Sequence, residues 1–136
     1  MKSWRDNDSG NLGTADVVIG VGQGVEPSDY EVLNGLAARI GAMVGATRKV
    51  TDRGWMPRAR QIGITGHSIA PALYLAVGTS GRFNHMIGAR SAGTVVGVNT
   101  DPDCELWDWC DIGVVGDWRE VLEALVPRLA KLGIEA

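Results

Sequence analysis

The sequence predicts an α/β fold of three layers, in which a parallel sheet is covered by helices on both faces. Along the 136 residues, short apolar runs alternate with segments of helical periodicity, an alternation typical of parallel strands linked by helices. Glycine is unusually frequent, with 19 residues, and many of the glycines stand at the ends of the apolar runs. Glycine at a strand exit lets the backbone adopt a positive φ or come close to a ligand.

Composition restricts the partners of the protein. The formal net charge of -3 argues against nucleic acid or an anionic membrane as a partner, because both attract basic surfaces. No apolar run reaches the ~20 residues that a spanning helix needs, so we expect no membrane insertion. Cys104 and Cys110 are expected to be reduced thiols in a cytoplasmic protein. Residues 1–14 are expected to be a flexible lead or a linker remnant, and residues 15–136 a single domain.

The first half of the chain begins with a strand, a glycine turn and a helix. Ser28 and Glu31 have the spacing of a capping box at the start of that helix. Arg48 is expected in an extended segment at the rim of the sheet. The predicted apolar face of the helix carries Leu33, Leu36, Ala37, Ile40 and Met43. The elements expected in this half are a strand at 15–22, a helix at 27–45, a short extended segment at 45–52, a loop at 53–60 and a strand at 60–66.

The second half contains the most apolar strand and the last helix. Asp117 stands three residues before Glu120 and is expected to cap that helix, and Pro127 is expected to kink or break it. Its apolar face carries Leu122, Leu125, Val126, Leu129 and Leu132. The elements expected in this half are a tight connection at 67–71, strands at 73–78, 94–99 and 111–116, a short helix at 83–89, an irregular segment at 101–110 and a helix at 117–133.

Polar side chains gather in the loops that follow the predicted strands. Open parallel sheets bind ligands beyond the carboxyl ends of their strands, so these loops predict a ligand site. The residues concerned are Gln23, Arg48, Thr65, Ser80, His85, Asn99 and Asp117.

Two glycine motifs suggest what that ligand contains. The run GVGQG at 20–24 lies between a strand and a helix, but it lacks the full dinucleotide spacing and equally suits a plain tight turn. The run GTSG at 78–81 precedes a short helix and favours phosphate binding over a simple turn, because backbone N–H groups there bind anions. Arg48 could be a solvated surface residue, and His85 could equally be a packing residue. No spacing of histidines and carboxylates indicates a metal site, and no catalytic triad is present.

Four stretches in this order resemble the C-terminal, FAD-binding domain of the electron-transfer flavoprotein α subunit. They are VGATR at 44–48, GITGHSIAPALYLAVGTSGRFNHMIGAR at 63–90, VGVNTDPDCELW at 96–107 and DIGVVGDW at 111–118. The resemblance implies a Rossmann-like nucleotide-binding fold of the deoxyhypusine synthase/sirtuin-like type, with FAD as cofactor. In a eukaryote it also implies the mitochondrial matrix as the equivalent compartment.

The resemblance also implies roles for single residues. Arg48 matches the arginine that packs against the isoalloxazine and favours its anionic reduced forms, and Thr47 precedes it at a flavin-contacting position. Thr65 matches a hydroxyl near the flavin N5, and His85 matches a histidine that donates near the pyrimidine oxygen. The further expected FAD contacts are Gln23, Ile62, Gly63, Ile64, Arg82 and Phe83; Ser80, Gly81 and Asn84 along the pyrophosphate and ribityl chain; and Asn99, Asp117 and Trp118 around the adenosine half.

Three positions depart from the family pattern. Gln23 stands where an arginine is usual, Ile64 replaces a glutamine, and His67 replaces a lysine. Loss of a cation and an amide is expected to weaken flavin binding, to shift the flavin potential, or to favour a smaller nucleotide such as AMP.

The family's α subunit also carries an N-terminal domain that has no counterpart in this sequence. The chain is therefore expected to be an excised domain or a natural minimal form. In the family the β subunit partly covers the isoalloxazine, so a β-like subunit or self-association is expected here. Trp55, Trp107 and Trp109 are candidates for such contacts or, equally, for core packing.

The function that follows from the resemblance is electron transfer without substrate chemistry of its own. FAD would receive electrons from a partner dehydrogenase of the acyl-CoA dehydrogenase type and pass them to a membrane or quinone-linked acceptor. The alternative is a nucleotide-binding module for AMP, ADP or FAD without redox activity. A third possibility, an enzyme domain of the same architecture, needs catalytic, thiamine or zinc motifs, and we find none in the sequence.

Overall fold

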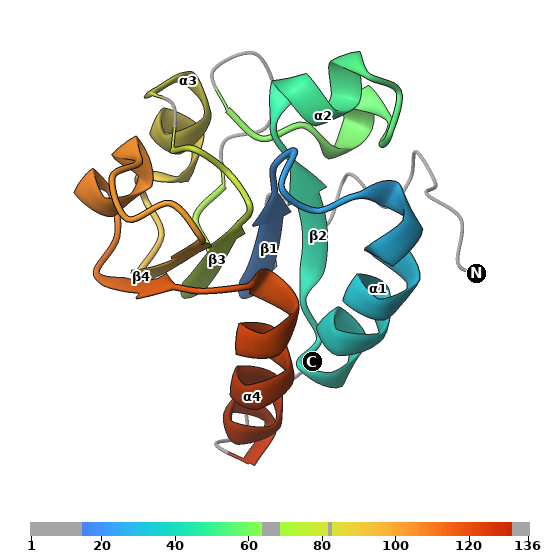
Figure 1. Ribbon diagram of the computed structural model, residues 1–136, viewed down its shortest axis with the longest axis vertical. Helices are drawn as coiled ribbons and strands as arrows, with labels where there is room; N and C mark the ends of the chain where they lie inside the picture. Colours follow the sequence, from blue (N-terminus) through green and yellow to red (C-terminus); the bar gives the residue numbers. More distant parts are fainter. Residues whose placement is uncertain (1–14, 64–68, 82, 132–136) are drawn as a thin grey trace.

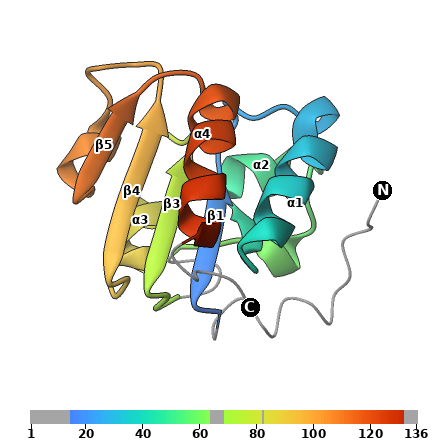
Figure 2. The same cartoon turned by 90° about the horizontal axis from the view of Figure 1, so that it is seen from below.

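A five-stranded parallel sheet forms the centre of the computed structural model, which describes residues 15–63, 69–81 and 83–131. The strands pair in the order β2-β1-β3-β4-β5, and every pair is parallel. Their common direction can be followed in Figures 1 and 2. Together with the helices that cover both of its faces, this parallel sheet confirms the predicted three-layer α/β fold. The strands are β1 (Val17–Val21), β2 (Met43–Ala46), β3 (Leu73–Val77), β4 (Thr94–Asn99) and β5 (Ile112–Val115).

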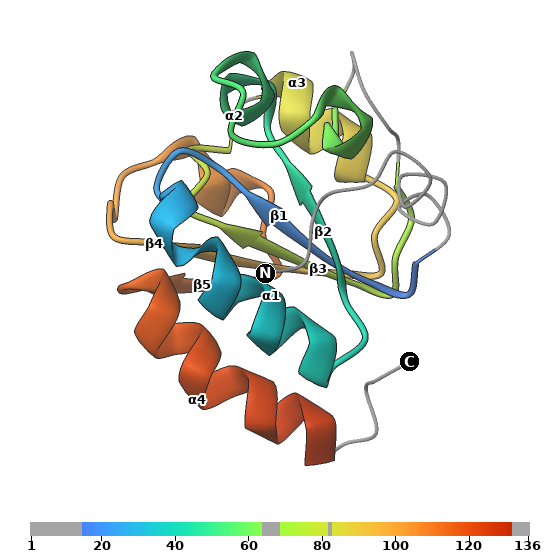
Figure 3. The ribbon, with the colours of Figure 1, turned by 90° about the vertical axis from the view of Figure 1, so that its right-hand side faces the viewer.

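Helices cover both faces of the sheet (Figure 3). The two long helices, α1 (Tyr30–Arg39) and α4 (Trp118–Lys131), lie side by side on one face. The other face carries short elements, and α2 (Arg48–Asp52) lies above the carboxyl ends of the strands (Figure 1). The short elements are α3 (Phe83–Met86) and the 3₁₀ turns η2 (Pro27–Asp29), η3 (Arg58–Arg60), η4 (Ile87–Ala89) and η5 (Glu105–Asp108), of which α3, η4 and η5 pack against the second face.

Two apolar cores, one on each face of the sheet, explain why the strands read as continuous apolar runs. Every residue of β1 is buried, with Ile19 in the core under α1 and α4 and Val18 in the core on the opposite face. Leu122 and Val126 of α4 are fully buried in the first core, as the helical spacing predicts. Burial on both faces favours apolar residues at successive positions instead of an alternating pattern.

The predicted first helix is shorter than expected, and its capping box is wrong. Ser28 lies inside η2, and α1 begins at Tyr30 with Asp29 as its N-cap, which makes no capping hydrogen bond through its side chain. The chain then turns at Gly41, where φ is +64°. Met43 consequently belongs to β2 and not to the helix. A glycine with positive φ ends the helical path before the next strand begins.

Arg48 was expected in an extended segment, and that expectation is wrong. β2 ends at Ala46, Thr47 is extended with ψ of 163°, and Arg48 is the first residue of α2. The short helix is held by tertiary contacts, because Val50 packs into the first core and the Thr51 hydroxyl lies 3.0 Å from the Arg48 carbonyl oxygen. Local β propensity is overridden there by burial of one side of the turn.

The strand expected at 60–66 is also wrong within the residues described. Arg60 ends η3, and Gln61 forms only an isolated bridge with Ala46; positions 64–66 lie outside the described residues. Arg60 donates from Nη1 to the Val44 carbonyl oxygen at 2.8 Å, and the Ile62 N–H donates to the Ala46 carbonyl oxygen at 2.9 Å. This segment covers the outer edge of β2, which would otherwise expose unpaired backbone groups.

The last helix carries one confirmed expectation and one that is contradicted in part. Asp117 caps α4 as predicted, because its Oδ2 accepts from the Glu120 N–H at 3.2 Å. The break at Pro127 does not occur, since α4 continues as one helix from Trp118 to Lys131. Proline removes one helical hydrogen bond. We attribute the continuity to Leu122 and Val126, whose complete burial holds the preceding turns against the sheet.

Candidate functional site

The loops after β1 and β3 meet at the point where the strand order reverses. The Gly22 N–H donates to the Val77 carbonyl oxygen at 3.0 Å, and the Gly24 N–H donates to the Gly78 carbonyl oxygen at 3.0 Å. A Cβ at Gly22 would lie 2.5 Å from the Gly78 carbonyl oxygen, so only glycine allows this approach. The two glycine motifs found in the sequence therefore form one surface. In sheets with this strand order, ligands bind in the crevice at such a switch point.

Among the residues that the structure describes, two pockets open at this edge of the sheet and share Gly78 and Asn99. The larger, of about 530 Å³, has a volume within the usual range for cofactor sites. The smaller, of about 90 Å³, lies toward the start of α4. The larger is lined by Gly22, Gln23, Thr47, Arg48, Lys49, Asp52, Gly78, Thr79, Ser80, His85 and Asn99. The smaller is lined by Gly24, Gly78, Val98, Asn99, Thr100, Gly116, Asp117 and Trp118.

Most of the predicted site residues that the structure describes line one of these pockets. Ile62, Gly63 and Gly81 line neither and serve packing. Ile62 is 1% exposed, a Cβ at Gly88 would lie 2.6 Å from the Gly63 backbone, and Gly81 packs against the Leu106 backbone. Three predicted contacts lie outside the described residues, namely Ile64, Thr65 and Arg82. Phe83 and Asn84 begin α3, but their side chains lie outside the described part.

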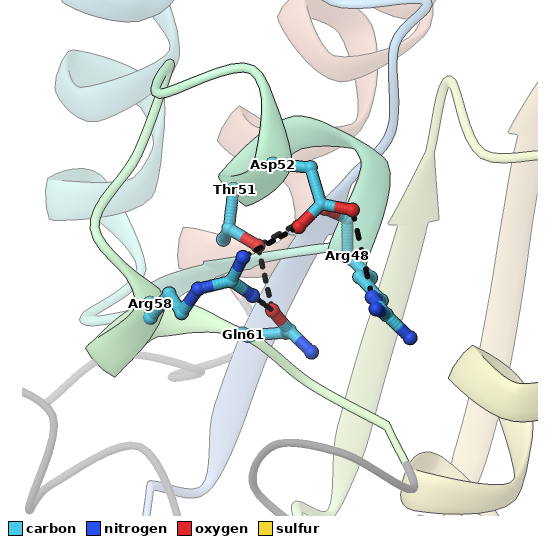
Figure 4. Close-up of polar contacts among 5 residues, drawn as sticks. All are labelled: Arg48, Thr51, Asp52, Arg58 and Gln61. Carbon is cyan, nitrogen blue, oxygen red and sulfur yellow. Dashed lines mark hydrogen bonds and ion pairs between the residues drawn. The ribbon is translucent and has the colours of Figure 1, made fainter.

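Arg48 stands at the mouth of the larger pocket in a network of charges (Figure 4). Its Nε lies 3.5 Å from the Asp52 carboxylate, which Arg58 Nη2 approaches more closely at 2.7 Å. The Arg48 side chain is 63% exposed. Because Arg58 makes the shorter contact with Asp52, the Arg48 guanidinium keeps hydrogen-bonding capacity for a ligand. Lys49 and Asp52 were missed in the sequence, although the i,i+4 spacing of Arg48 and Asp52 was a visible signal.

Gln61 ties α2 to the segment that covers β2 (Figure 4). Its Oε1 lies 2.6 Å from the Thr51 hydroxyl and accepts from Arg58 Nη1 at 3.2 Å. Gln61 is 2% exposed and Thr51 6% exposed. The buried pair restricts the position of the helix that carries Arg48.

Gln23 lies beside Arg53, a contact that the sequence did not indicate. With its amide oxygen turned toward Arg53, Gln23 accepts a hydrogen bond from Arg53 Nη2 at 2.9 Å. The Arg53 guanidinium also lies 5.4 Å from the centroid of the Trp55 ring, a distance suited to a cation–π contact. The arginine expected at position 23 from the family pattern is thus replaced by a glutamine with an arginine next to it. Trp55 itself packs half-buried against the first core.

The loop after β3 is held by side chains of the site itself. Asn99 Nδ2 donates to the Thr79 carbonyl oxygen at 2.8 Å, and the Thr79 hydroxyl accepts from the Gly81 N–H at 3.3 Å. Asn99 therefore positions the loop that carries Ser80, which lines the larger pocket. The sequence did not point to Thr79, because its role depends on its backbone carbonyl and on a hydrogen bond that its hydroxyl accepts from Gly81, two residues away.

His85 is buried at the wall of the larger pocket, with 5% exposure. Nδ1 lies 3.1 Å from the Ile62 carbonyl oxygen, and Nε2 lies 2.5 Å from the Tyr74 hydroxyl. Burial lowers the pKa of His85 from 6.5 to about 4, although the bond to Ile62 opposes the shift. Burial raises the pKa of Tyr74 above its ordinary value. Both groups are therefore neutral near pH 7.

Residues 11–90 match a protein family described as the electron transfer flavoprotein FAD-binding domain. The chain belongs to this family. It is 37% identical over 123 residues to the electron transfer flavoprotein subunit alpha of Thermoanaerobacterium thermosaccharolyticum, covering 90% of this chain and 37% of the relative. The mitochondrial subunit alpha of Oryza sativa subsp. indica is 40% identical over 126 residues, with 92% of this chain and 35% of the relative covered. Protein FixB of Azorhizobium caulinodans is 38% identical over 122 residues, with coverages of 89% and 33%.

The chain spans about a third of the length of these three relatives. The family assignment confirms the resemblance and the expected cofactor, FAD. Within the described residues, no helix is long and apolar enough to cross a bilayer. Over the same residues, no three histidine, cysteine or acidic side chains gather as a metal site would require.

The described residues fit FAD as a ligand. The two pockets lie in succession from α2 to the start of α4 along the carboxyl edge of the sheet, which suits an elongated dinucleotide. Gly22 and Gly78 allow the two loops to meet through their backbones, and both glycines line the larger pocket. Among the described residues that line the larger pocket, Arg48 and Lys49 supply two cations against the single carboxylate of Asp52, and this excess suits an anionic ligand.

The low pKa of His85 predicts a pH-dependent stability. The unfolded imidazole, with an ordinary pKa of 6.5, binds a proton more readily than the folded one at about 4. Stability therefore rises with pH between about 4 and 6.5 and is lost as the pH falls through this window. The expected loss in unfolding free energy between pH 7 and pH 5 is about 2 kcal/mol from this group. Urea unfolding at both pH values measures it.

The control for this prediction is His85→Gln, which lacks the titrating ring. Because Gln cannot titrate, the difference in unfolding free energy between pH 7 and pH 5 is expected to be smaller in the variant. Equal pH dependence of the two proteins would contradict the assignment of the effect to His85.

Proposed function

We propose that the domain binds FAD along the carboxyl edge of the sheet and acts as an electron carrier. The observation that carries the proposal is the larger pocket, in which Arg48 and Lys49 face the glycine loops of β1 and β3. Bound FAD supplies the redox chemistry, and the chain contributes position and electrostatics. Electrons come from a flavin dehydrogenase of the acyl-CoA dehydrogenase type and pass to a membrane or quinone-linked acceptor. The domain is a carrier and not a catalyst of substrate chemistry.

The residues divide the site into two ends. Thr47, Arg48 and His85 line the larger pocket and hold the flavin end. Asp117 and Trp118 line the smaller pocket and hold the adenosine end, with Asn99 shared between the two. Ser80 and its loop lie along the pyrophosphate and ribityl chain. A fixed cation at Arg48 stabilises negative charge that develops on a group nearby, and exclusion of water strengthens this effect.

A β-like subunit is the proposed partner, with self-association as the alternative. Two observations support a covering surface. The Arg48 side chain is 63% exposed at the flavin end, and a cation left in water is screened. The relatives named above include proteins called subunit alpha, a name that implies another subunit. We further propose that the FAD-binding domain comprises residues 15–136 and works in the cytoplasm or, in a eukaryote, the mitochondrial matrix, where the free thiols of Cys104 and Cys110 stay reduced.

The first test is the visible absorption spectrum of the purified protein before and after addition of FAD. The released nucleotide is identified by chromatography. We expect flavin bands that co-elute with the protein, bleach on chemical reduction and return in air. A colourless protein that ignores FAD and retains AMP or ADP would overturn the redox function and support a plain nucleotide-binding module.

A further inference from the structure

Tyr74 is a buried polar residue that the proposed function does not use. It lies on β3 with 0% exposure, and its hydroxyl reaches His85 Nε2 on α3 at 2.5 Å. The two ring centroids are 6.0 Å apart and the rings are inclined by 41°. The contact joins two elements on the second face of the sheet.

The partners of His85 determine which ring nitrogen carries the proton. The Ile62 carbonyl oxygen can only accept, so the nitrogen that contacts it at 3.1 Å, Nδ1, must be the donor. In a neutral imidazole the other nitrogen, Nε2, is then an acceptor, and Tyr74 must donate to it. Both nitrogens are engaged by the chain itself, so His85 presents no free N–H to the pocket.

The sequence makes room for this hydroxyl on the neighbouring strand. Gly20 of β1 pairs with Ala76 of β3, and a Cβ at Gly20 would collide with the Tyr74 hydroxyl. A second glycine contact lies next to Ile62, the other partner of His85. Gly88 brings the turn after α3 against the backbone of Gly63, which adjoins Ile62. The absence of a side chain at both positions keeps Tyr74, His85 and Ile62 together.

We propose that Tyr74 is a positioning residue that holds His85 in the neutral Nδ1–H tautomer and withholds a proton from Nε2. The proposal adds to the FAD site a control over whether His85 can donate to a ligand. Before His85 donates from Nε2 to an acceptor in the pocket, that nitrogen must gain a proton and the Tyr74 hydroxyl must stop donating to it. Tyr74 thus opposes the charged imidazolium, which would otherwise lie at the wall of the pocket.

Several titratable and charged side chains lie around His85. Tyr74 is the titratable group in direct contact, and Cys110 acts in turn on Tyr74. Arg48, Lys49 and Asp52 share the pocket that His85 lines. The burial that lowers the pKa of His85 acts in the same direction as Tyr74, because both favour the neutral ring.

Nitrogen-15 NMR of the FAD-free chain tests the proposal directly. The sequence contains only two histidines, and His67→Gln identifies the signals of His85. We expect the wild type to show Nδ1 protonated and Nε2 as a hydrogen-bonded acceptor. In Tyr74→Phe the titration midpoint of His85 should rise toward its ordinary value, because the variant removes the hydrogen bond that favours the neutral ring. Tyr30→Phe, at another buried tyrosine with 3% exposure, should leave both the tautomer and the midpoint unchanged.

An Nε2–H tautomer in the wild type would overturn the proposal, and this measurement does not require the Tyr74 variant to fold. The proposal would also be overturned if the nitrogen shifts and titration midpoint of His85 were the same in Tyr74→Phe as in Tyr30→Phe. A second readout rests on the proposed function: as the pH falls through the new midpoint of His85, the reduction potential of FAD bound to Tyr74→Phe should rise more than that of FAD bound to the wild type. A chain that fails to bind FAD would refute the proposed function and leave the NMR result on Tyr74 standing.

Discussion

Replacing Arg48 with alanine is expected to lower the reduction potential of bound FAD by about 40 mV, or about 1 kcal/mol for one electron. Arg48 is a cation at the wall of the larger pocket, and removing it removes stabilisation of negative charge on the reduced cofactor. The value is modest because the side chain is 63% exposed and solvent screens its field. Potentiometric titration of the FAD-loaded protein measures the effect.

Arg58→Ala is the matched control for this prediction. Arg58 binds the same Asp52 carboxylate and has a similar exposure of 66%, but it does not line the pocket. Figure 4 shows the two arginines reaching Asp52 from different segments. The Arg58 variant is expected to change the potential much less than the Arg48 variant. Equal shifts in both would mean that general surface charge, and not the position of Arg48, sets the potential.

Replacing Gly81 with alanine is expected to destabilise the fold by about 2–4 kcal/mol and to weaken FAD binding. Gly81 has φ of +81°, a region that side chains rarely adopt, and a Cβ there would collide with the Leu106 backbone. Leu106 is fully buried in the second core, so it has little freedom to move away. The loop that carries Ser80 must therefore shift. Urea denaturation and FAD titration by fluorescence measure the two effects.

Gly35→Ala is the matched control for Gly81→Ala. Gly35 lies within α1, is exposed, and has no atom within 4 Å of the place that a Cβ would take. Alanine there is expected to stabilise the protein by about 0.5–1 kcal/mol, because it restricts the unfolded chain and suits the helix. If Gly81→Ala were as stable as the wild type, the close approach to Leu106 would not exist in solution.

The glycine motifs show how far the sequence led toward the site. GVGQG and GTSG marked the right loops, but the sequence suggested only turns or phosphate contacts for them. Their further role is to let two loops touch, since a Cβ at Gly22 would meet the Gly78 carbonyl oxygen at 2.5 Å. That requirement links residues more than fifty positions apart, so no local pattern could reveal it.

Some side chains of the site could be identified from the sequence, and others could not. Gln23, Arg48 and His85 were identified as candidates, and each lines the larger pocket. Arg53 was missed because it follows a short helix that had been read as an extended segment. The FAD contacts expected at Thr65 and Arg82 lie outside the described residues and stay predictions.

By itself, the sequence determined the α/β class, four of the five strands (β1, β3, β4 and β5), the two long helices and the family to which the chain belongs. These depend on apolar periodicity and on motifs of adjacent residues, which are local properties. The tertiary structure alone decided that Arg48 begins a helix, that Arg53 lies beside Gln23, and that Tyr74 and Ile62 engage both nitrogens of His85. The physical reason is that strand register and burial bring together polar groups far apart in the chain, and buried groups must find partners wherever the packing leaves them.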